Sequence, residues 1–586
     1  MDRFTEDRKT IGLIIEDLAI DYAKEIIRSV QLATAAFPNL RLLVLPGLHE
    51  QLEYGKTSSF YDTRVHNMVY GLEEIVKIDG LLLTLPNISG VSGGSIFDDA
   101  FSNYARVPRV FISTAVTDGV TVRYDNEKGI REAVNYLVNV KGLRKFVMLG
   151  GRDDNADAQD RKEVYRKCLA EKHIEFTEDM YEKTDMSIEA LAEAERLMKR
   201  NPDAEAVFCV NDQVAVPLYR VLKELGMKPG RDIQVFGFDN TKFSGTMLPP
   251  LASIGADGMT LGEKAVEMLL RMMKGEKVES AVLPTKLFGK ESLEYAMYEY
   301  TTMEMLRIDE TFVYRMFDDC FYRYRSEVHD REEVDLRRLF YEFITRMLRA
   351  MISSSMSPEE FNEVRRLIDI FFSNGAMRYT DPAHMVRCIE RLQNGMNKSQ
   401  KTPLSNVMTN RCFSYMKDRA IVSMAADANR FDANLKVERE RIRNFFVCGT
   451  QFDGGNTVTE ETIIRNIDKL SFSNAALYLF EKPVPVPPEG AITFPETARL
   501  MCVVKDGELR VLSPERRACR LDAMLERTEL PKCGAYIASL VFYGSRIYGV
   551  LITEVTGTVA DRGEFVAKQL AQILYINEMN HKSDKE

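Results

Sequence analysis

The sequence predicts an α/β fold for the first half of the chain, an α-helical middle and an α+β module at the end. In the first half, the apolar runs VFCV (207–210) and IQVFGF (233–238) flank the amphipathic segment QVAVPLYRVLKELG. Two buried strands joined by a crossover helix are the repeating unit of a parallel sheet. Past residue 294 apolar residues recur at a spacing of three and four, and past residue 448 strand–turn–strand patterns return.

Both of these strands are followed at once by polar residues. Asn211-Asp212 follows the first strand, and Asp239-Asn240 follows the second. In open α/β sheets, ligands bind just beyond the carboxyl ends of the parallel strands. We therefore expect these side chains to face a small polar ligand.

The pattern around residues 207–240 resembles the lactose-repressor/purine-repressor family of sugar sensors, whose fold is that of the type I periplasmic binding proteins. The resemblance extends over roughly residues 10–293, in the order that the family shows. It implies a two-lobed clamp for a small metabolite, with a domain spanning residues 1–293. The segments that carry it are TIGLIIEDLAIDYAKEIIRSVQLA, IDGLLLTLP, VTVRYDNEKGIREAVNYLV, KFVMLGGRDDNADAQDRKEVYRKCLAEKHI and VLPTKLF.

Two site residues follow from the resemblance. Tyr22 matches the aromatic position that stacks on the ligand ring in the family, and sugar C–H faces pack well on aromatic rings. Arg161 matches the family's ligand-binding arginine, whose planar guanidinium can donate paired hydrogen bonds to hydroxyls or a carboxylate. The alternatives are an apolar helix-face residue for Tyr22 and a solvated helix residue for Arg161.

Four further polar residues are candidates. Asn211 offers a donor and an acceptor, whereas Asp239 offers acceptors only, and both suit the hydroxyls of a sugar. Asp212 and Asp125 match positions of the family too, but each precedes a predicted helix and is equally suited to capping it. Met186 and Ala256 depart from residues common in relatives, which leaves a modified sugar or a nucleoside as alternatives.

Composition indicates a globular protein of about three domains. The chain has 586 residues, 28% of them charged, and a net charge of −10, which disfavours a large nucleic-acid-binding surface. The charged start MDRFTEDRKT lacks the apolar core of a signal peptide, and no apolar run is long enough to span a membrane. We expect a cytoplasmic protein without membrane contact.

Catalytic and metal-binding patterns are missing from the sequence. The nine cysteines form no CxxC pair and the six histidines lie in unrelated contexts, so we expect free buried thiols and no metal. No serine elbow or HExxH motif is present. The sequence thus predicts a protein that is not an enzyme and needs no cofactor.

About ten residues precede the first predicted strand, at Ile11. The helix-turn-helix headpiece of the family needs some fifty to sixty. We therefore expect no direct binding to nucleic acid and an output through a protein partner.

The middle segment, residues 294–447, is predicted to be a helical linker or dimerisation segment. Apolar residues recur at helical spacing in VDLRRLFYEFITRMLRAMI, and Ser357-Pro358-Glu359-Glu360 has the pattern of a helix start. A last helix is expected from about Lys417 to Phe446, with dense charges that suit a dimer or signalling helix. A solvated connector is the alternative.

Residues 448–586 resemble a GAF-like domain with a C-terminal helix. The order of elements carries this resemblance: a helix, the strand NAALYLFEK, further strands, the hairpin AYIASLVFYGSRIYGVLITEV and a closing helix. It implies a small-molecule-binding or dimerisation module, as in the sensory half of bacterial diguanylate-cyclase-type signalling proteins.

Together these features predict a non-catalytic sensor that binds a small polar metabolite, a sugar or sugar derivative, and signals as a homodimer. One alternative is a transcription regulator that binds DNA through the helical middle. The other is the sensory half of a larger signalling protein.

Overall fold

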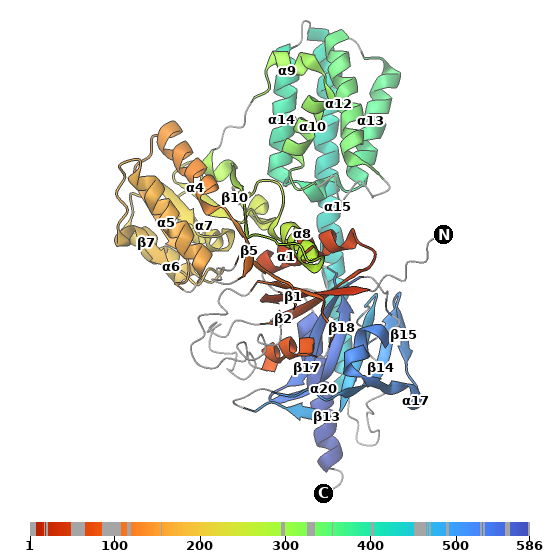
Figure 1. Cartoon of the computed structure of the whole chain (residues 1–586). Coiled ribbons are helices and arrows are strands. Elements are labelled where there is room, and N and C mark those ends of the chain that lie inside the picture. The colour runs from red at the N-terminus through yellow and green to blue at the C-terminus, as the bar shows by residue number, and fades with distance from the viewer. Residues whose placement is uncertain are drawn as a thin grey trace.

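The computed structural model shows four connected parts: two lobes, a bundle of helices and a C-terminal α+β unit (Figure 1). The structure describes residues 8–16, 18, 21–47, 65–74, 76–84, 107–113, 119–153, 155–294, 299–324, 334–353, 356–399, 403–450, 464–465, 467, 470, 472–487, 492–527, 530, 534–556 and 563–583.

The first lobe is a parallel sheet with the strand order β11-β5-β4-β3-β1-β2. Its strands are short apolar runs, as expected for a sheet that is covered on both faces. Helices α1 and α8 pack on one another beside this sheet. The elements are β1 (Lys9–Glu16), α1 (Asp21–Ala35), β2 (Leu40–Gly47), η1 (Met68–Glu74), β3 (Gly80–Leu83), β4 (Arg109–Ile112), β5 (Val120–Tyr124), α8 (Leu261–Met273) and β11 (Ala281–Leu283).

The second lobe is a sheet with the order β12-β10-β9-β8-β6-β7, parallel except for the β10–β12 pair. The predicted strand–helix–strand unit is present as β8, α7 and β9. The elements are α4 (Asn126–Asn135), β6 (Phe146–Gly150), α5 (Ala156–Ala170), β7 (Tyr181–Lys183), α6 (Leu191–Arg200), β8 (Ala206–Cys209), α7 (Asp212–Glu224), β9 (Gln234–Phe238), η5 (Phe243–Thr246), β10 (Ala252–Ala256) and β12 (Thr285–Phe288).

The helical unit follows the second lobe. Ser357 begins α13 as predicted, with a reciprocal capping box to Glu360. The last helix is longer than expected: α15 begins at Pro403 and not near Lys417, and over 48 residues it extends about 72 Å at 1.5 Å per residue. The helices are α9 (Thr302–Arg307), α10 (Glu310–Cys320), α12 (Leu336–Ser353), α13 (Pro358–Ser373), α14 (Pro382–Ser399) and α15 (Pro403–Thr450).

The C-terminal unit is an antiparallel sheet with the order β17-β18-β13-β14-β15, and α20 packs against β17. Its main elements are β13 (Ala475–Pro485), β14 (Thr497–Lys505), β15 (Glu508–Val511), α17 (Pro514–Arg517), β16 (Ala518–Arg520), α18 (Met524–Arg527), β17 (Ala535–Tyr543), β18 (Arg546–Glu554) and α20 (Gly563–Ser583).

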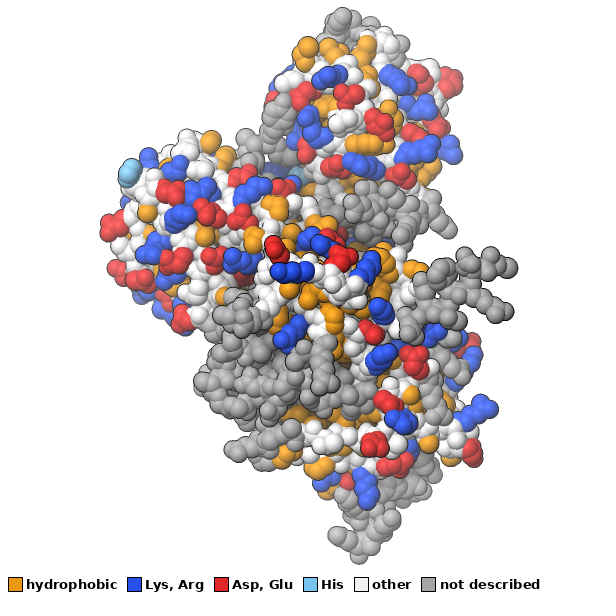
Figure 2. All heavy atoms as spheres, viewed as in Figure 1, with side chains coloured by type: hydrophobic (Ala, Val, Ile, Leu, Met, Phe, Trp, Pro, Cys, Tyr) orange, Lys and Arg blue, Asp and Glu red, His pale blue; other side chains and the backbone are white. Residues whose placement is uncertain are grey.

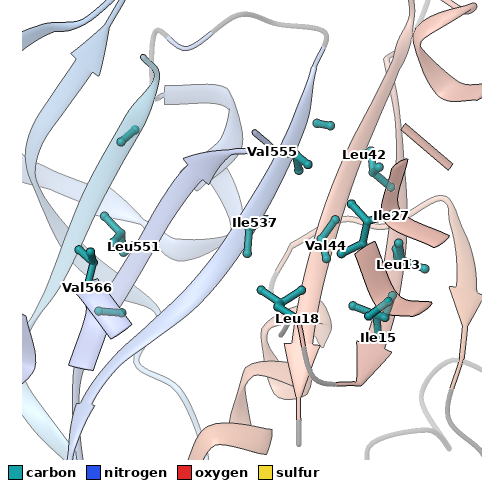
Figure 3. Close-up of a cluster of buried hydrophobic side chains, with 14 of the residues drawn as sticks. Leu13, Ile15, Leu18, Ile27, Leu42, Val44, Ile537, Leu551, Val555 and Val566 are labelled. Carbon is teal, nitrogen blue, oxygen red and sulfur yellow. The ribbon is translucent and has the colours of Figure 1, made fainter. Parts of the chain in front are cut away.

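The first lobe and the C-terminal unit share one sheet. Strand β2 pairs in parallel with β17, and Val44 lies opposite Ile537. Both side chains lie in a single hydrophobic core, which extends from Leu13 in the first lobe to Leu551 and Val566 in the C-terminal unit (Figure 3). The predicted first and third domains are therefore joined by backbone hydrogen bonds as well as by packing.

Helix α15 runs from the helical unit down to the C-terminal unit, where Phe445 enters the shared core (Figure 1). The seven cysteines whose side chains the structure describes are free and buried. Among the described helices, none is both long and apolar enough to cross a lipid bilayer.

Candidate functional site

A cavity of about 160 Å³ lies where the two lobes and the helical unit meet. Helix α1 and Tyr124, at the end of β5, form its first-lobe wall. Asp239 and the two residues after it form the second-lobe wall, and Tyr322 and Arg323 reach the cavity from the end of α10. The second-lobe wall follows the carboxyl end of β9, the location that parallel sheets favour for ligands.

Tyr22, predicted to stack on a ligand ring, lies on the cavity wall. It is in the first turn of α1, and its hydroxyl donates to Ser113 Oγ at 2.9 Å. Burial raises the pKa of Tyr22, so the hydroxyl stays protonated at neutral pH. The ring is held by this bond, which suits it for stacking on a ligand.

Asp239 is the second predicted residue that the structure brings to the cavity. Its φ is +96°, a left-handed conformation that a residue other than glycine adopts at a cost of about 1–3 kcal/mol. Burial raises the pKa of its carboxyl, although Arg161 opposes that shift. Such strain and desolvation are typical of residues at functional sites.

Arg161 lies behind Asp239 and is 5% exposed. Its guanidinium donates to Val210 O at 2.8 Å, to Asn126 Oδ1 at 3.3 Å and to Asp239 Oδ1 at 3.4 Å. The same group stacks on the Phe238 ring, 3.6 Å from its centroid. In this structure Arg161 therefore holds the Asp239 carboxylate and does not line the cavity.

Asn211 and Asp125 cap helices. Asn211 Oδ1 accepts from Val214 N at 3.1 Å at the start of α7, and its amide donates to Met186 O at 3.0 Å. Asp125 Oδ1 accepts from Glu127 N at 2.9 Å at the start of α4. Both side chains are outside the cavity wall, and capping is the alternative that the sequence had left open for Asp125.

Asp212 is fully buried and links three elements of the second lobe. Its carboxylate accepts hydrogen bonds from the Thr241 N–H at 2.8 Å, the Thr241 hydroxyl at 2.8 Å and the Ser253 hydroxyl at 2.6 Å. It therefore fixes the loop that carries Asp239, and Asn211, not Asp212, provides the cap of α7.

Asp212 predicts a pH effect on stability. Burial raises the pKa of its carboxyl to about 7, against about 3.9 in an unfolded chain. The folded protein then binds more protons than the unfolded chain between these values, so the free energy of unfolding falls as the pH rises from about 4 to about 7. Relative to Asp212→Asn, wild type should lose stability between pH 5 and 8 in chemical denaturation. Parallel pH profiles of the two proteins would contradict this role.

A cluster of charged side chains, here called the joint, connects the second lobe to the helical unit. Asp381, which precedes α14, lies 3.5 Å from Lys290 Nζ and 2.6 Å from Arg323 NH1, and it accepts a hydrogen bond from the Tyr322 hydroxyl. Lys290 also donates to Asn240 Oδ1 at 3.0 Å. Despite burial, which raises it, the pKa of Asp381 is held below its usual value by Lys290 and Arg323.

Tyr124, Tyr322 and Arg323 are among the cavity residues that sequence reasoning missed. Tyr124 ends a parallel strand, so the rule that selected Asp239 could have selected it as well. Tyr322 and Arg323 follow the second lobe by more than thirty residues, and no local pattern indicates their return to the cleft.

Comparison with known proteins places the second lobe and its flanks in a recognised class. A family model described as a periplasmic binding protein-like domain matches residues 134–293. The HTH-type transcriptional repressor PurR of Vibrio atlanticus (strain LGP32) is 26% identical over 209 residues, which are 35% of this chain and 61% of that protein. The HTH-type transcriptional repressor CytR of Escherichia coli (strain K12) is 26% identical over 279 residues, 47% of this chain and 75% of that protein.

Among solved structures, the Lac repressor bound to ONPG is similar with a TM-score of 0.41 and 21% identity, over 49% of this chain and 83% of that one. A CelR–cellobiose complex has a TM-score of 0.40 and 22% identity, over 49% of this chain and 85% of the other.

The chain spans about three fifths of the length of the PurR relative. These relatives are transcriptional regulators, which are not enzymes, and the prediction of a protein without catalysis agrees with them. The predicted two-lobed α/β fold is present. Residues 134–293 of this chain therefore match a periplasmic binding protein-like domain, and up to about half of the chain is similar to part of these transcriptional regulators.

Proposed function

We propose that this protein is a non-catalytic regulator that binds a small polar metabolite, a sugar or sugar derivative, between its two lobes. The cavity carries the proposal, because Tyr22 of the first lobe and Asp239 of the second lobe border the same space. An aromatic face packs on the C–H face of a sugar ring, and a carboxylate accepts hydrogen bonds from its hydroxyls.

Ligand binding would favour the closed arrangement of the lobes only as far as the ligand binds that arrangement more tightly. The joint would pass a movement of the second lobe to the helical unit. The shared sheet would keep the C-terminal unit with the first lobe. Closure would thus change how the helical and C-terminal units lie relative to each other.

For the C-terminal unit we propose a GAF-like role in dimerisation or in binding a second small molecule. Its antiparallel order β17-β18-β13-β14-β15 and the closing helix α20 support this assignment. The output would pass through a homodimer or a protein partner.

Binding is tested with the full chain against a panel of sugars, nucleosides and their phosphates in thermal-shift assays, followed by calorimetry. A ligand at 100 times its dissociation constant should stabilise the folded state by about 2.7 kcal/mol. Asp239→Asn should raise the dissociation constant of that ligand by about 10- to 100-fold, since a hydrogen bond to a charged group contributes about 1.5–3 kcal/mol.

The matched control is Asp203→Asn, an exposed carboxylate of the second lobe that pairs with Lys145. It should bind like wild type. A ligand that binds wild type and Asp239→Asn equally well would contradict binding in this cavity. A panel in which no compound binds would contradict the binding of a small metabolite.

The similarity to transcriptional repressors supports a second candidate, regulation of transcription by direct DNA contact. On the face seen in Figure 2, basic and acidic side chains are interspersed and no large basic patch is visible. A gel-shift assay on the DNA upstream of the protein's own gene discriminates between the two. Retardation that weakens steeply with salt would favour DNA binding, because released counterions drive such complexes.

A further inference from the structure

The cavity has a basic side that the sequence did not indicate. Arg28 of α1 and Arg323 of the helical unit both line it, and Lys242, the residue after Thr241, lies close enough to both to feel their charges. These three cations come from three different parts of the molecule.

The acids that line the same cavity are Glu25, Asp239 and Glu263. Within the described part of the chain, Arg28 and Lys242 form no ion pair. Of the acids on the cavity wall, Glu263 accepts hydrogen bonds from the backbone and hydroxyl of Thr260, and Asp239 is paired with Arg161. Glu25, the remaining acid, is exposed and lies one helical turn before Arg28.

Arg323 has a counter-ion, but that counter-ion does not neutralise it fully. Its counter-ion, Asp381, is shared with the buried Lys290, so one carboxylate serves two cations. Among the described residues, Nη2 of Arg323 donates to the backbone carbonyls of Asn240 and Thr241, both at the long distance of 3.4 Å. The guanidinium is fixed in place by these contacts and faces the cavity while 17% exposed.

We propose that the cavity binds a ligand that carries an anionic group, a phosphate or a carboxylate, held between Arg28 and Arg323. This inference rests on the proposed function, and it makes the helical unit a direct contact of the ligand. Arginine suits the task because its planar fork of N–H donors matches both oxyanions and forms short, charge-assisted hydrogen bonds.

The neighbouring lysine agrees with this placement. Desolvation and the positive charges of Arg28 and Arg323 lower the pKa of Lys242 to about 8, although Glu25 and Asp381 oppose that shift. Like charges that raise each other's free energy are relieved when an anion enters between them. The anion would also connect α1, the loop after Asp239 and the end of α10, and so favour the closed arrangement.

The test uses inorganic phosphate and acetate as probes of the full chain. Each is titrated by calorimetry at constant ionic strength, with chloride as the exchanged anion. We expect saturable binding of at least one probe, and Arg28→Gln and Arg323→Gln should each weaken it by about tenfold or more, as expected for the loss of a charge-assisted hydrogen bond. Tighter binding of phosphate assigns a phosphorylated ligand, and tighter binding of acetate assigns a carboxylate.

Arg315→Gln is the matched control. Arg315 is exposed on α10, the helix that ends just before Arg323, and it pairs with Glu304. It should bind the probe like wild type. Arg28→Gln guards against a folding defect, because Arg28 has no ion pair with any residue that the structure describes. The proposal of an anionic ligand group is overturned if neither probe binds saturably, or if Arg28→Gln and Arg323→Gln both bind like wild type. A neutral sugar or nucleoside that still binds wild type would then leave the proposed function intact.

Discussion

Asp381→Ala is expected to lower the free energy of unfolding by about 3–5 kcal/mol, as found when one partner of a buried ion pair is removed. The carboxylate is 3% exposed and Lys290 is 2% exposed, so the substitution leaves a buried ammonium without its counter-ion. It also removes the acceptor of Arg323 and Tyr322. The loss should appear in chemical denaturation, and hydrogen exchange should rise in η5 and at the start of α14, which pack together.

A double variant separates the charge from the shape of the joint. Lys290→Met with Asp381→Leu replaces the pair by apolar groups of similar size, and such replacements are often neutral or stabilising. We expect the double variant to regain the part of the loss that the unpaired Lys290 causes, while Arg323 and Tyr322 still lack their acceptor. If Asp381→Ala alone were as stable as wild type, the joint would not hold the second lobe to the helical unit.

Ile537→Ala is expected to destabilise two parts of the molecule that are almost five hundred residues apart in sequence. Ile537 is fully buried in β17 and lies opposite Val44 in β2, within the shared core. An isoleucine-to-alanine change in a core costs about 2–5 kcal/mol, since buried methyl groups are lost and a cavity remains. Hydrogen exchange should therefore rise together in β1, β2, β17 and β18, and denaturation should show one shifted transition for them.

Leu367→Ala in α13 is the control of equal chemistry, because Leu367 packs in the separate core of the helical unit. It should raise exchange in the helical unit and leave β2 and β17 protected. Exchange that rises only in the C-terminal unit of Ile537→Ala would mean that the sheet junction contributes little stability.

Local pattern was sufficient for the elements near residues 207–240. Alternation of apolar runs with an amphipathic helix predicted β8, α7 and β9, and the rule for parallel strands placed Asp239 at the ligand side. Position along a strand did not reveal what each polar group would bond. The Asn211 side chain caps α7 and donates to Met186 O. The Asp212 carboxylate accepts hydrogen bonds from Thr241 and Ser253 within the protein.

Long-range contacts were beyond prediction from local pattern for a physical reason. The pairing of Val44 with Ile537 depends on which strand edge is free after each part has folded, and neither segment encodes that in its periodicity. The same holds for Arg323, whose place at the cavity depends on Asp381 and on the loop after Asp239. The start of α15 was placed too late, although Pro403 at its first position is a helix-start signal.

The four parts of this molecule form a closed mechanical loop. Three chain crossings connect the two lobes, and the joint connects the second lobe to the helical unit. Helix α15 connects the helical unit to the C-terminal unit, and the pairing of β2 with β17 connects that unit back to the first lobe. In a linkage of this kind no member turns alone. Because long helices curve gently, a change of angle between the lobes would be accommodated by curvature of the solvent-exposed part of α15.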